Sequence, residues 1–182
     1  MLNWRPADPE MYEDVQTVYN YNHSALNKSP EQRLKKLWRS SRDSARTPVQ
    51  WSGEENAGFT TGTPWLPVNE NYKEINVERE EADPDSLLNF YRKAIALRKS
   101  ISAVRHGSYR EYFKRSKRLY VYTREFEDEK LLVICSFTEK ETKIKLPKNF
   151  DLSKAELILA NYRERDEKTL KPYECRVYLL KN

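Results

Sequence analysis

The chain has 182 residues, of which 33 are basic and 28 acidic, so its formal net charge at pH 7 is +5. This length holds one ordinary domain or two small ones. Acidic and basic residues are interspersed, whereas nucleic-acid-binding domains concentrate their basic residues in a patch. The sequence has no run of about 20 apolar residues that would span a membrane and no apolar signal-peptide core near its first residue. We therefore expect a cytoplasmic protein that binds neither nucleic acid nor membrane.

Residue types that usually hold metals or nucleotides are sparse. His23 and His106 are isolated from each other and from cysteine, so no zinc-type spacing exists. With four glycines the sequence contains no phosphate-binding loop. We expect no metal and no cofactor. Cys135 and Cys175 lie far apart in apolar segments and can pair only if the fold brings their strands together, so buried free thiols are the favoured interpretation.

Two helices are predicted within residues 1–41. Asp8 followed by Pro9 is a start signal for the first helix. The second begins with Ser29 as N-cap, Pro30 in the first helical position and Gln32 three residues after the cap, which is a capping-box pattern. An apolar stripe at helical spacing follows: Leu34, Leu37 and Trp38.

Residues 42–82 contain three of the four glycines and several prolines among polar and aromatic residues. A segment of about 40 residues is long for a plain loop, and long ordered loops are commonly functional. Asp83 and Pro84 then predict another helix start, and the helix runs through to Lys99. Its broad apolar face consists of Leu87, Leu88, Tyr91, Ala94, Ile95 and Leu97.

From residue 107 onward the hydrophobic period changes to two. Residues 118–124, 142–146 and 175–179 alternate as half-buried strands do. Residues 131–137 are almost continuously apolar, which suits a central strand covered on both faces. The sequence therefore predicts an α+β protein whose second half is an antiparallel sandwich of about six or more strands.

Five segments carry a resemblance to a known family. They are RDSARTPVQW at 42–51, NAGFTTGTPW at 56–65, VNENYKEINVE at 68–78, DPDSLLNFYRKAIALRKS at 83–100 and LKPYECRVYLL at 170–180. Together they resemble the oligo-1,6-glucosidase and α-glucosidase branch of the α-amylase superfamily, glycoside hydrolase family 13. In that family such segments follow the last strand of a (β/α)8 barrel. The resemblance implies that residues 1–103 are a helical and loop remnant of the barrel end and that residues 104–182 are the antiparallel β C-terminal domain.

The implied function is that of a C-terminal fragment of an enzyme that hydrolyses α-linked gluco-oligosaccharides. The family's catalytic carboxylates come from barrel strands upstream of the matched region, so the resemblance assigns no catalytic residue here and the chain alone is expected to be inactive. Retaining hydrolysis needs two carboxyls about 5–5.5 Å apart in a rigid frame. Asp14, Asp43 and Glu54 lie in predicted helices or loops without such a frame, so we expect them to be solvated.

One substrate contact maps by motif. The second arginine of RD-x-x-RTP-x-QW contacts glucose in the family, and this position is Arg46. A guanidinium can donate to vicinal hydroxyls and to a carboxylate at once. The alternative is an arginine that only anchors the loop. Three aromatic side chains of this segment could stack on sugar rings, but we expect them to anchor the loop by packing instead: Trp51, Phe59 and Trp65.

Other functions remain open. The tyrosine-rich β-domain is also compatible with a noncatalytic module that binds carbohydrate or a partner. Trehalose-6-phosphate hydrolases carry similar motifs, so a fragment of one of them is an alternative. The apolar helix faces predict self-association if they are exposed.

Overall fold

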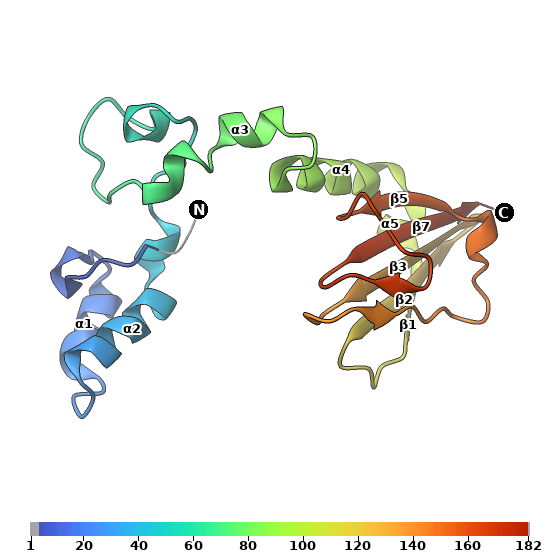
Figure 1. The fold of residues 1–182 in the computed structure, drawn as a ribbon, viewed down its shortest axis with the longest axis horizontal. Coiled ribbons are helices and arrows are strands. Elements are labelled where there is room, and N and C mark those ends of the chain that lie inside the picture. The colour runs from blue at the N-terminus through green and yellow to red at the C-terminus, as the bar shows by residue number, and fades with distance from the viewer. Residues whose placement is uncertain (1–3, 182) are drawn as a thin grey trace. The chain divides into compact units, whose positions relative to one another are not determined.

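The computed structural model describes residues 4–181, which divide into two compact units between Pro84 and Asp85 (Figure 1). The first unit consists of short helices and loops, and the second combines helices with an antiparallel sheet. The predicted α+β class is confirmed. The predicted domain boundary at 103/104 is that of the family and stays a prediction. The two compact units of this chain are divided differently, because the helices that follow Asp85 belong to the same unit as the sheet.

The helices of the first unit begin where side chains cap them. In chain order they are η1 (Pro9–Met11), α1 (Val15–His23), α2 (Pro30–Ser40), η2 (Arg42–Ala45), η3 (Glu55–Gly58), η4 (Glu70–Lys73) and α3 (Val77–Ala82), with η denoting a 3₁₀ helix. The predicted capping box at Ser29 is confirmed. The prediction that the first α-helix starts at Asp8 was wrong, because Asp8 caps the short 3₁₀ helix η1 instead. The α-helix begins after Asp14, whose side chain accepts from the backbone N–H of Thr17.

The second unit opens with α4 (Leu87–Ser100) and α5 (Ser102–His106). The N-cap of α4 is Ser86, whose hydroxyl accepts from the Asn89 N–H at 3.2 Å, so the helix starts after the predicted Asp83–Pro84 signal. Much of the apolar face of α4 is on the surface of the described residues, since the exposed fractions of Leu87, Tyr91 and Ile95 are 67%, 60% and 50%.

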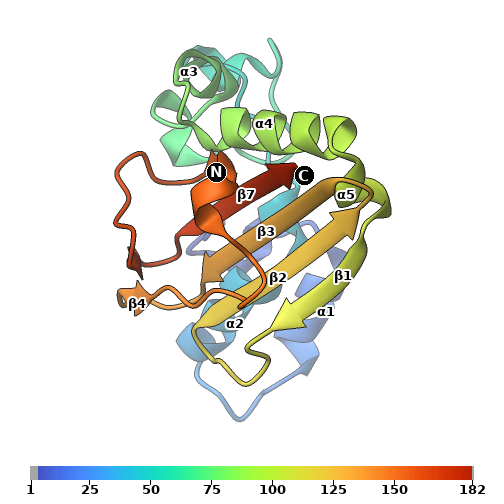
Figure 2. The same ribbon diagram turned by 90° about the vertical axis from the view of Figure 1, so that its right-hand side faces the viewer.

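Five antiparallel strands form the sheet in the order β1-β2-β3-β7-β5 (Figure 2). Their bounds are β1 (Ser108–Tyr112), β2 (Leu119–Phe126), β3 (Glu129–Ser136), β5 (Glu156–Ala160) and β7 (Cys175–Lys181). The register between β5 and β7 shifts between Leu157 and Leu159. Two short strands, β4 (Thr142–Lys143) and β6 (Thr169–Leu170), pair as a separate ribbon, and η5 (Leu152–Lys154) precedes β5. The strand predicted at 142–146 is therefore shorter than expected.

The central strand β3 has apolar packing on both faces, as its continuous apolar run predicts. Leu131 and Val133 pack in one cluster with residues of α5, and Leu132 and Ile134 pack in another with Phe150. Leu132 and Ile134 have no exposed surface. Burial of each such side chain stabilises the folded state by about 1.5–3 kcal/mol.

Polar contacts also fix α5 to the sheet. The backbone N–H of Ala103, a fully buried residue, donates to Glu129 Oε2 at 2.9 Å. The Arg124 guanidinium donates from Nε to the Ala103 carbonyl at 2.9 Å and from Nη2 to the Gly107 carbonyl at 2.7 Å. These bonds satisfy the backbone groups at both ends of a short helix, so α5 is part of the sheet's core.

A buried ion pair lies between strand β7 of the sheet and the two-stranded ribbon of β4 and β6. Arg176 on β7 donates from Nε to Glu174 Oε1 at 2.6 Å, and the exposed fractions of the two residues are 2% and 0%. The other guanidinium nitrogens donate to the carbonyls of Asp166 and Thr169, and Glu174 Oε2 accepts from the Lys171 N–H at 2.7 Å. Because each guanidinium nitrogen of Arg176 and each carboxylate oxygen of Glu174 has a hydrogen-bond partner, burial of the two charges is tolerated.

Candidate functional site

Arg46, the residue singled out by the motif, lies at the C-terminal end of η2. Its backbone N–H donates to the Asp43 carbonyl at 2.9 Å. Its Nη1 lies 3.3 Å from Asp14 Oδ1 and 3.5 Å from Asp43 Oδ1. The side chain is 42% exposed. Arg46 is therefore tied to two carboxylates of its own chain while part of its guanidinium faces outward.

Asp14 and Asp43 are buried, so the expectation that they are solvated was wrong. Asp43 has no exposed surface, and its Oδ2 accepts from the backbone N–H groups of Glu13 and Asp14 at 2.9 and 2.8 Å. Asp14 caps α1 by accepting from the N–H and hydroxyl of Thr17 at 3.0 and 2.7 Å. The two acids connect η2 with the start of α1. Glu54 is exposed, as expected.

Electrostatics keeps Asp14 ionised. Burial raises the pKa of its carboxyl, but hydrogen bonds from Thr17 and Arg42 outweigh burial and hold the pKa below its ordinary value. Burial, and then the negative charge of Asp43, raise the pKa of Tyr12 to about 12, so its phenol is protonated at neutral pH. Among residues 4–181 the Tyr12 hydroxyl has no hydrogen-bond partner; Asp43 Oδ1 also has none, although it lies at ion-pair distance from Arg46 Nη1.

A second guanidinium shares Asp14. Arg42 Nη2 lies 2.5 Å from Asp14 Oδ1, and the Arg42 side chain is 62% exposed. Arg42 and Arg46 thus present N–H donors on the surface above one buried carboxylate. Such donors can bind hydroxyls of a sugar or an anionic group. A general acid must be protonated before it can donate a proton. Asp14 is ionised and paired with two arginines, so it is not suited to that role.

The motif's glutamine holds the loop that follows. Gln50 is buried, and its Nε2 donates to the Ile75 carbonyl at 2.5 Å and to Asn71 Oδ1 at 3.2 Å. The three aromatic residues of this loop, by contrast, are exposed by 46–63%: Trp51, Phe59 and Trp65. Their expected anchoring role stays a prediction.

Sequence reasoning missed the structural roles of Asp14 and Gln50. The pattern of Asp14 with Thr17 three residues later is a local N-cap signal that was available in the sequence. Gln50 has no local signal, because both its partners lie more than twenty positions away.

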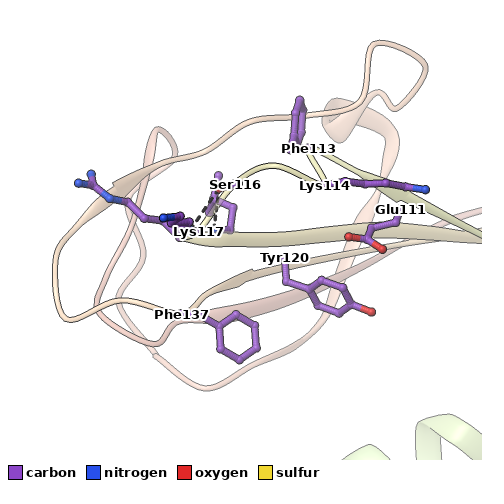
Figure 3. A pocket seen from close by; sticks show the side chains of 9 residues that line it. Glu111, Phe113, Lys114, Ser116, Lys117, Tyr120 and Phe137 are labelled. Carbon is purple, nitrogen blue, oxygen red and sulfur yellow. Dashed lines mark hydrogen bonds between the residues drawn. The ribbon is translucent and has the colours of Figure 1, made fainter.

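The second unit contains a hollow of about 250 Å³ at the β1–β2 hairpin (Figure 3). Tyr120 and Phe137 line one side of it, with their ring centroids 6.3 Å apart. Among the residues described along its wall, Glu111 is the single carboxylate. The hollow therefore does not supply the pair of carboxyls that glycoside hydrolysis needs.

Residues 4–181 contain no group of three or more His, Cys, Asp or Glu side chains placed to hold a metal ion. None of the helices in this range combines the length and apolar character needed to cross a bilayer.

Comparison with known proteins extends the description of the chain. The family "Alpha amylase, catalytic domain" matches residues 10–107. A probable oligo-1,6-glucosidase 2 of Bacillus subtilis (strain 168) is 42% identical over 176 residues, which cover 94% of this chain and 31% of that protein. An oligo-1,6-glucosidase of Parageobacillus thermoglucosidasius is 39% identical over 188 residues, covering 100% of this chain and 34% of that protein.

Solved structures give a similar result. The crystal structure of Bacillus licheniformis trehalose-6-phosphate hydrolase superimposes with a TM-score of 0.91 at 41% identity, covering 100% of this chain and 34% of that chain. The present chain therefore spans about a third of the length of the relatives that it matches.

Proposed function

This chain belongs to the alpha-amylase family, and we propose that it is the C-terminal part of a glycoside hydrolase that acts on α-linked gluco-oligosaccharides. The observation that carries the proposal is continuous similarity across both units, with 39% identity to an oligo-1,6-glucosidase over the full chain. In this proposal residues 1–103 are the helical and loop remnant of the end of a (β/α)8 barrel, and residues 104–182 are an antiparallel β-sandwich of the α-amylase C-terminal type. The catalytic-domain match that ends at residue 107 supports that boundary.

In the proposed enzyme Arg46 contacts the glucose unit. Asp14 and Asp43 hold the guanidinium by its Nη1 edge, which leaves other N–H groups for hydroxyls. A side chain positioned in advance by two carboxylates loses little conformational freedom on binding. The nucleophile and the general acid come from residues outside this chain, so the isolated chain is expected to lack hydrolytic activity.

A hybrid enzyme tests the proposal. The segment that precedes the matched region in the B. subtilis relative would be joined to this chain, and the product assayed with nitrophenyl α-glucoside and isomaltose. We expect hydrolysis by the hybrid and none by the chain alone. Arg46→Ala in the hybrid is expected to cost about 2–4 kcal/mol of transition-state stabilisation, or roughly 30- to 1000-fold in kcat/KM.

Arg39→Ala is the matched control, since Arg39 is an exposed arginine near the end of α2. It should leave kcat/KM within about twofold of the parent. Circular dichroism establishes that each variant is folded. Turnover by the isolated chain that disappears on mutating one of its own acids would refute the proposal. Unaltered kcat/KM in the Arg46→Ala hybrid would make Arg46 a loop anchor.

Trehalose 6-phosphate is the second candidate substrate, favoured by the TM-score of 0.91 with the B. licheniformis hydrolase. The hybrid, assayed with isomaltose, maltose and trehalose 6-phosphate side by side, distinguishes the two. A kcat/KM at least tenfold higher for the phosphorylated disaccharide would assign the chain to the second group.

We also infer self-association of the isolated chain through the apolar face of α4, because Leu87, Tyr91 and Ile95 are exposed. Sedimentation velocity at increasing concentration measures it, with Tyr91→Lys as the weakening variant. The cytoplasmic location expected from the sequence stays a prediction.

A further inference from the structure

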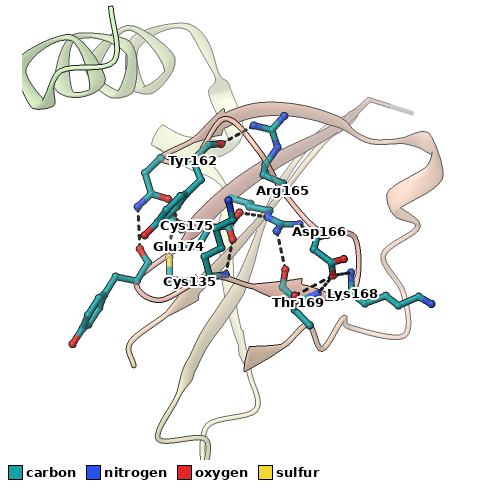
Figure 4. A network of polar contacts seen from close by, with 12 residues as sticks. Cys135, Tyr162, Arg165, Asp166, Lys168, Thr169, Glu174 and Cys175 are labelled. Atoms are coloured by element: carbon teal, nitrogen blue, oxygen red, sulfur yellow. Dashed lines mark hydrogen bonds and ion pairs between the residues drawn. The ribbon is translucent and has the colours of Figure 1, made fainter. Parts of the chain in front are cut away.

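The two cysteines of the chain face each other across neighbouring strands. Cys135 on β3 and Cys175 on β7 are directly opposed in the register, and their Sγ atoms lie 3.1 Å apart (Figure 4). Both are free thiols and half-buried, so the pair is in contact without being covalently joined. Two thiols in hydrogen-bond contact need little movement to form a disulfide with each other.

The hydrogen-bond pattern identifies the type of cross-strand pair. At the adjacent position the Ser136 N–H donates to the Glu174 carbonyl at 2.8 Å. The backbone N–H and carbonyl of Cys175 are bonded instead to Asn161, on the side away from β3. Cys135 and Cys175 therefore form a non-hydrogen-bonded pair, in which Cα atoms are about 4.5 Å apart. This separation is within the range of about 4.4–6.8 Å that a disulfide requires.

We propose that Cys135 and Cys175 form a modification site that a low-molecular-weight disulfide oxidises reversibly to a cross-strand disulfide. In the first step the Cys175 thiolate attacks the oxidant, forms a mixed disulfide and releases one thiolate. In the second step the Cys135 thiolate attacks the Cys175 sulfur and releases the second thiolate. The two protein thiols lose two electrons to the oxidant, and their protons pass to the two released thiolates.

The roles of the two thiols follow from their contact. The Cys135 S–H donates to the Cys175 sulfur, which lowers the pKa of the Cys175 thiol although burial and the charge of Glu174 oppose the effect. The same hydrogen bond and burial raise the pKa of the Cys135 thiol. Cys175 is thus the thiol that reacts first, and Cys135 is the resolving thiol.

The disulfide closes a loop that contains β4, η5, β5 and β6, because these elements lie between the two cysteines in the chain. A cross-link of this kind reduces the entropy of the unfolded chain. We therefore expect the oxidised form to be more stable to heat, with a rise in Tm of roughly 5 °C or more that a reducing agent reverses.

The test uses the full chain and glutathione disulfide. After incubation at mildly alkaline pH the protein is denatured and alkylated, and intact-mass measurement separates free dithiol, mixed disulfide and internal disulfide. The internal disulfide weighs about 2 Da less than the dithiol and takes up no alkylating group. We expect this form to predominate, and peptide mapping without reduction to link the peptides that contain Cys135 and Cys175.

Cys135→Ser is the matched variant because it keeps the attacking thiol and removes the resolving one. It should accumulate the mixed disulfide at Cys175, whereas the parent holds less than a tenth of that amount. Cys175→Ser should react more slowly than Cys135→Ser. If a serine variant fails to fold, the mass and peptide map of the parent decide alone. Stable mixed disulfides in the parent, disulfide-linked dimers or two unreacted thiols would each overturn the proposal.

Discussion

Breaking the buried ion pair between Arg176 and Glu174 should destabilise the second unit strongly. Arg176→Met keeps most of the apolar stem but removes the guanidinium. The Glu174 carboxylate, which has no exposed surface, then keeps only the Lys171 N–H as a hydrogen-bond donor. The carbonyls of Asp166 and Thr169 also lose their partners.

The expected cost is large because a charge is left unpaired in the interior. Removing one partner of a buried ion pair costs about 3–5 kcal/mol. Domains of this size have a total stability of about 5–15 kcal/mol, so the substitution removes a substantial part of it. At about 4–8 °C per kcal/mol the Tm should fall by roughly 12 °C or more.

A double-mutant cycle separates the pair from its surroundings. Glu174→Gln combined with Arg176→Met removes both charges, and the glutamine oxygen can still accept from the Lys171 N–H. We expect the double variant to be little worse than the single arginine variant, with a coupling energy of about 2–3 kcal/mol. Urea unfolding followed by far-UV circular dichroism gives each free energy.

Arg165→Met is the matched control, because Arg165 is exposed and donates to the Tyr162 carbonyl in the loop before β6. It should change the free energy of unfolding by less than about 0.5 kcal/mol. A cost below about 1 kcal/mol for Arg176→Met, or single effects that add without coupling, would show that the pair is solvated and that this reasoning is wrong.

Three further predictions concern both units. Gly107→Ala should destabilise the second unit by about 1–3 kcal/mol in thermal unfolding, because an added Cβ would lie 2.3 Å from the Ala103 carbonyl oxygen. A truncated chain of residues 104–182 should be less stable to urea than residues 85–182 by about 3 kcal/mol or more, since it loses the buried side chains of Ile101 and Ala103 and, with the Ala103 carbonyl, one of the two acceptors of Arg124; equal midpoints would contradict this. Stability of the first unit should fall as pH drops below about 4. The pKa of Asp14 is lower in the folded chain than in the unfolded chain, so its ionised carboxylate stabilises the fold at any pH above the unfolded-state pKa. This stabilisation is lost as the pH falls from the unfolded-state pKa through the folded-state pKa. Tryptophan fluorescence measures this transition because all four tryptophans lie in the first unit, and Asp14→Asn should flatten the pH dependence.

Local signals predicted much of the fold. The capping box at Ser29 and the continuous apolar run that became β3 were confirmed, because each depends on residues close together in the sequence. The start of α1 was misplaced because Asp8 and Asp14 are both good caps. The contact of Asp43 with the backbone before α1 favours the second, and a contact between residues so far apart is not visible in a local pattern.

The buried charges were not predictable for a related reason. Alternation of Cys175, Val177 and Leu179 indicates one apolar face on β7 and places Arg176 on the opposite face, where an antiparallel strand is usually solvated. The ribbon of β4 and β6 lies over that opposite face, so Arg176 is 2% exposed. The family motif identified Arg46, but the carboxylates that hold it depend on how η2 meets α1.

The strand order has a consequence for how this sheet meets other molecules. With β3 at the centre, the edges are β1 and β5, and each carries a feature that discourages a further strand from pairing. On β1 the charged Arg110 and Glu111 are adjacent, and on β5 the register slips between Leu157 and Leu159. The irregularity breaks the regular backbone ladder of β5, and the charges on β1 make a second strand costly to add there, so both edges disfavour intermolecular β-pairing, the first step toward amyloid-like stacking.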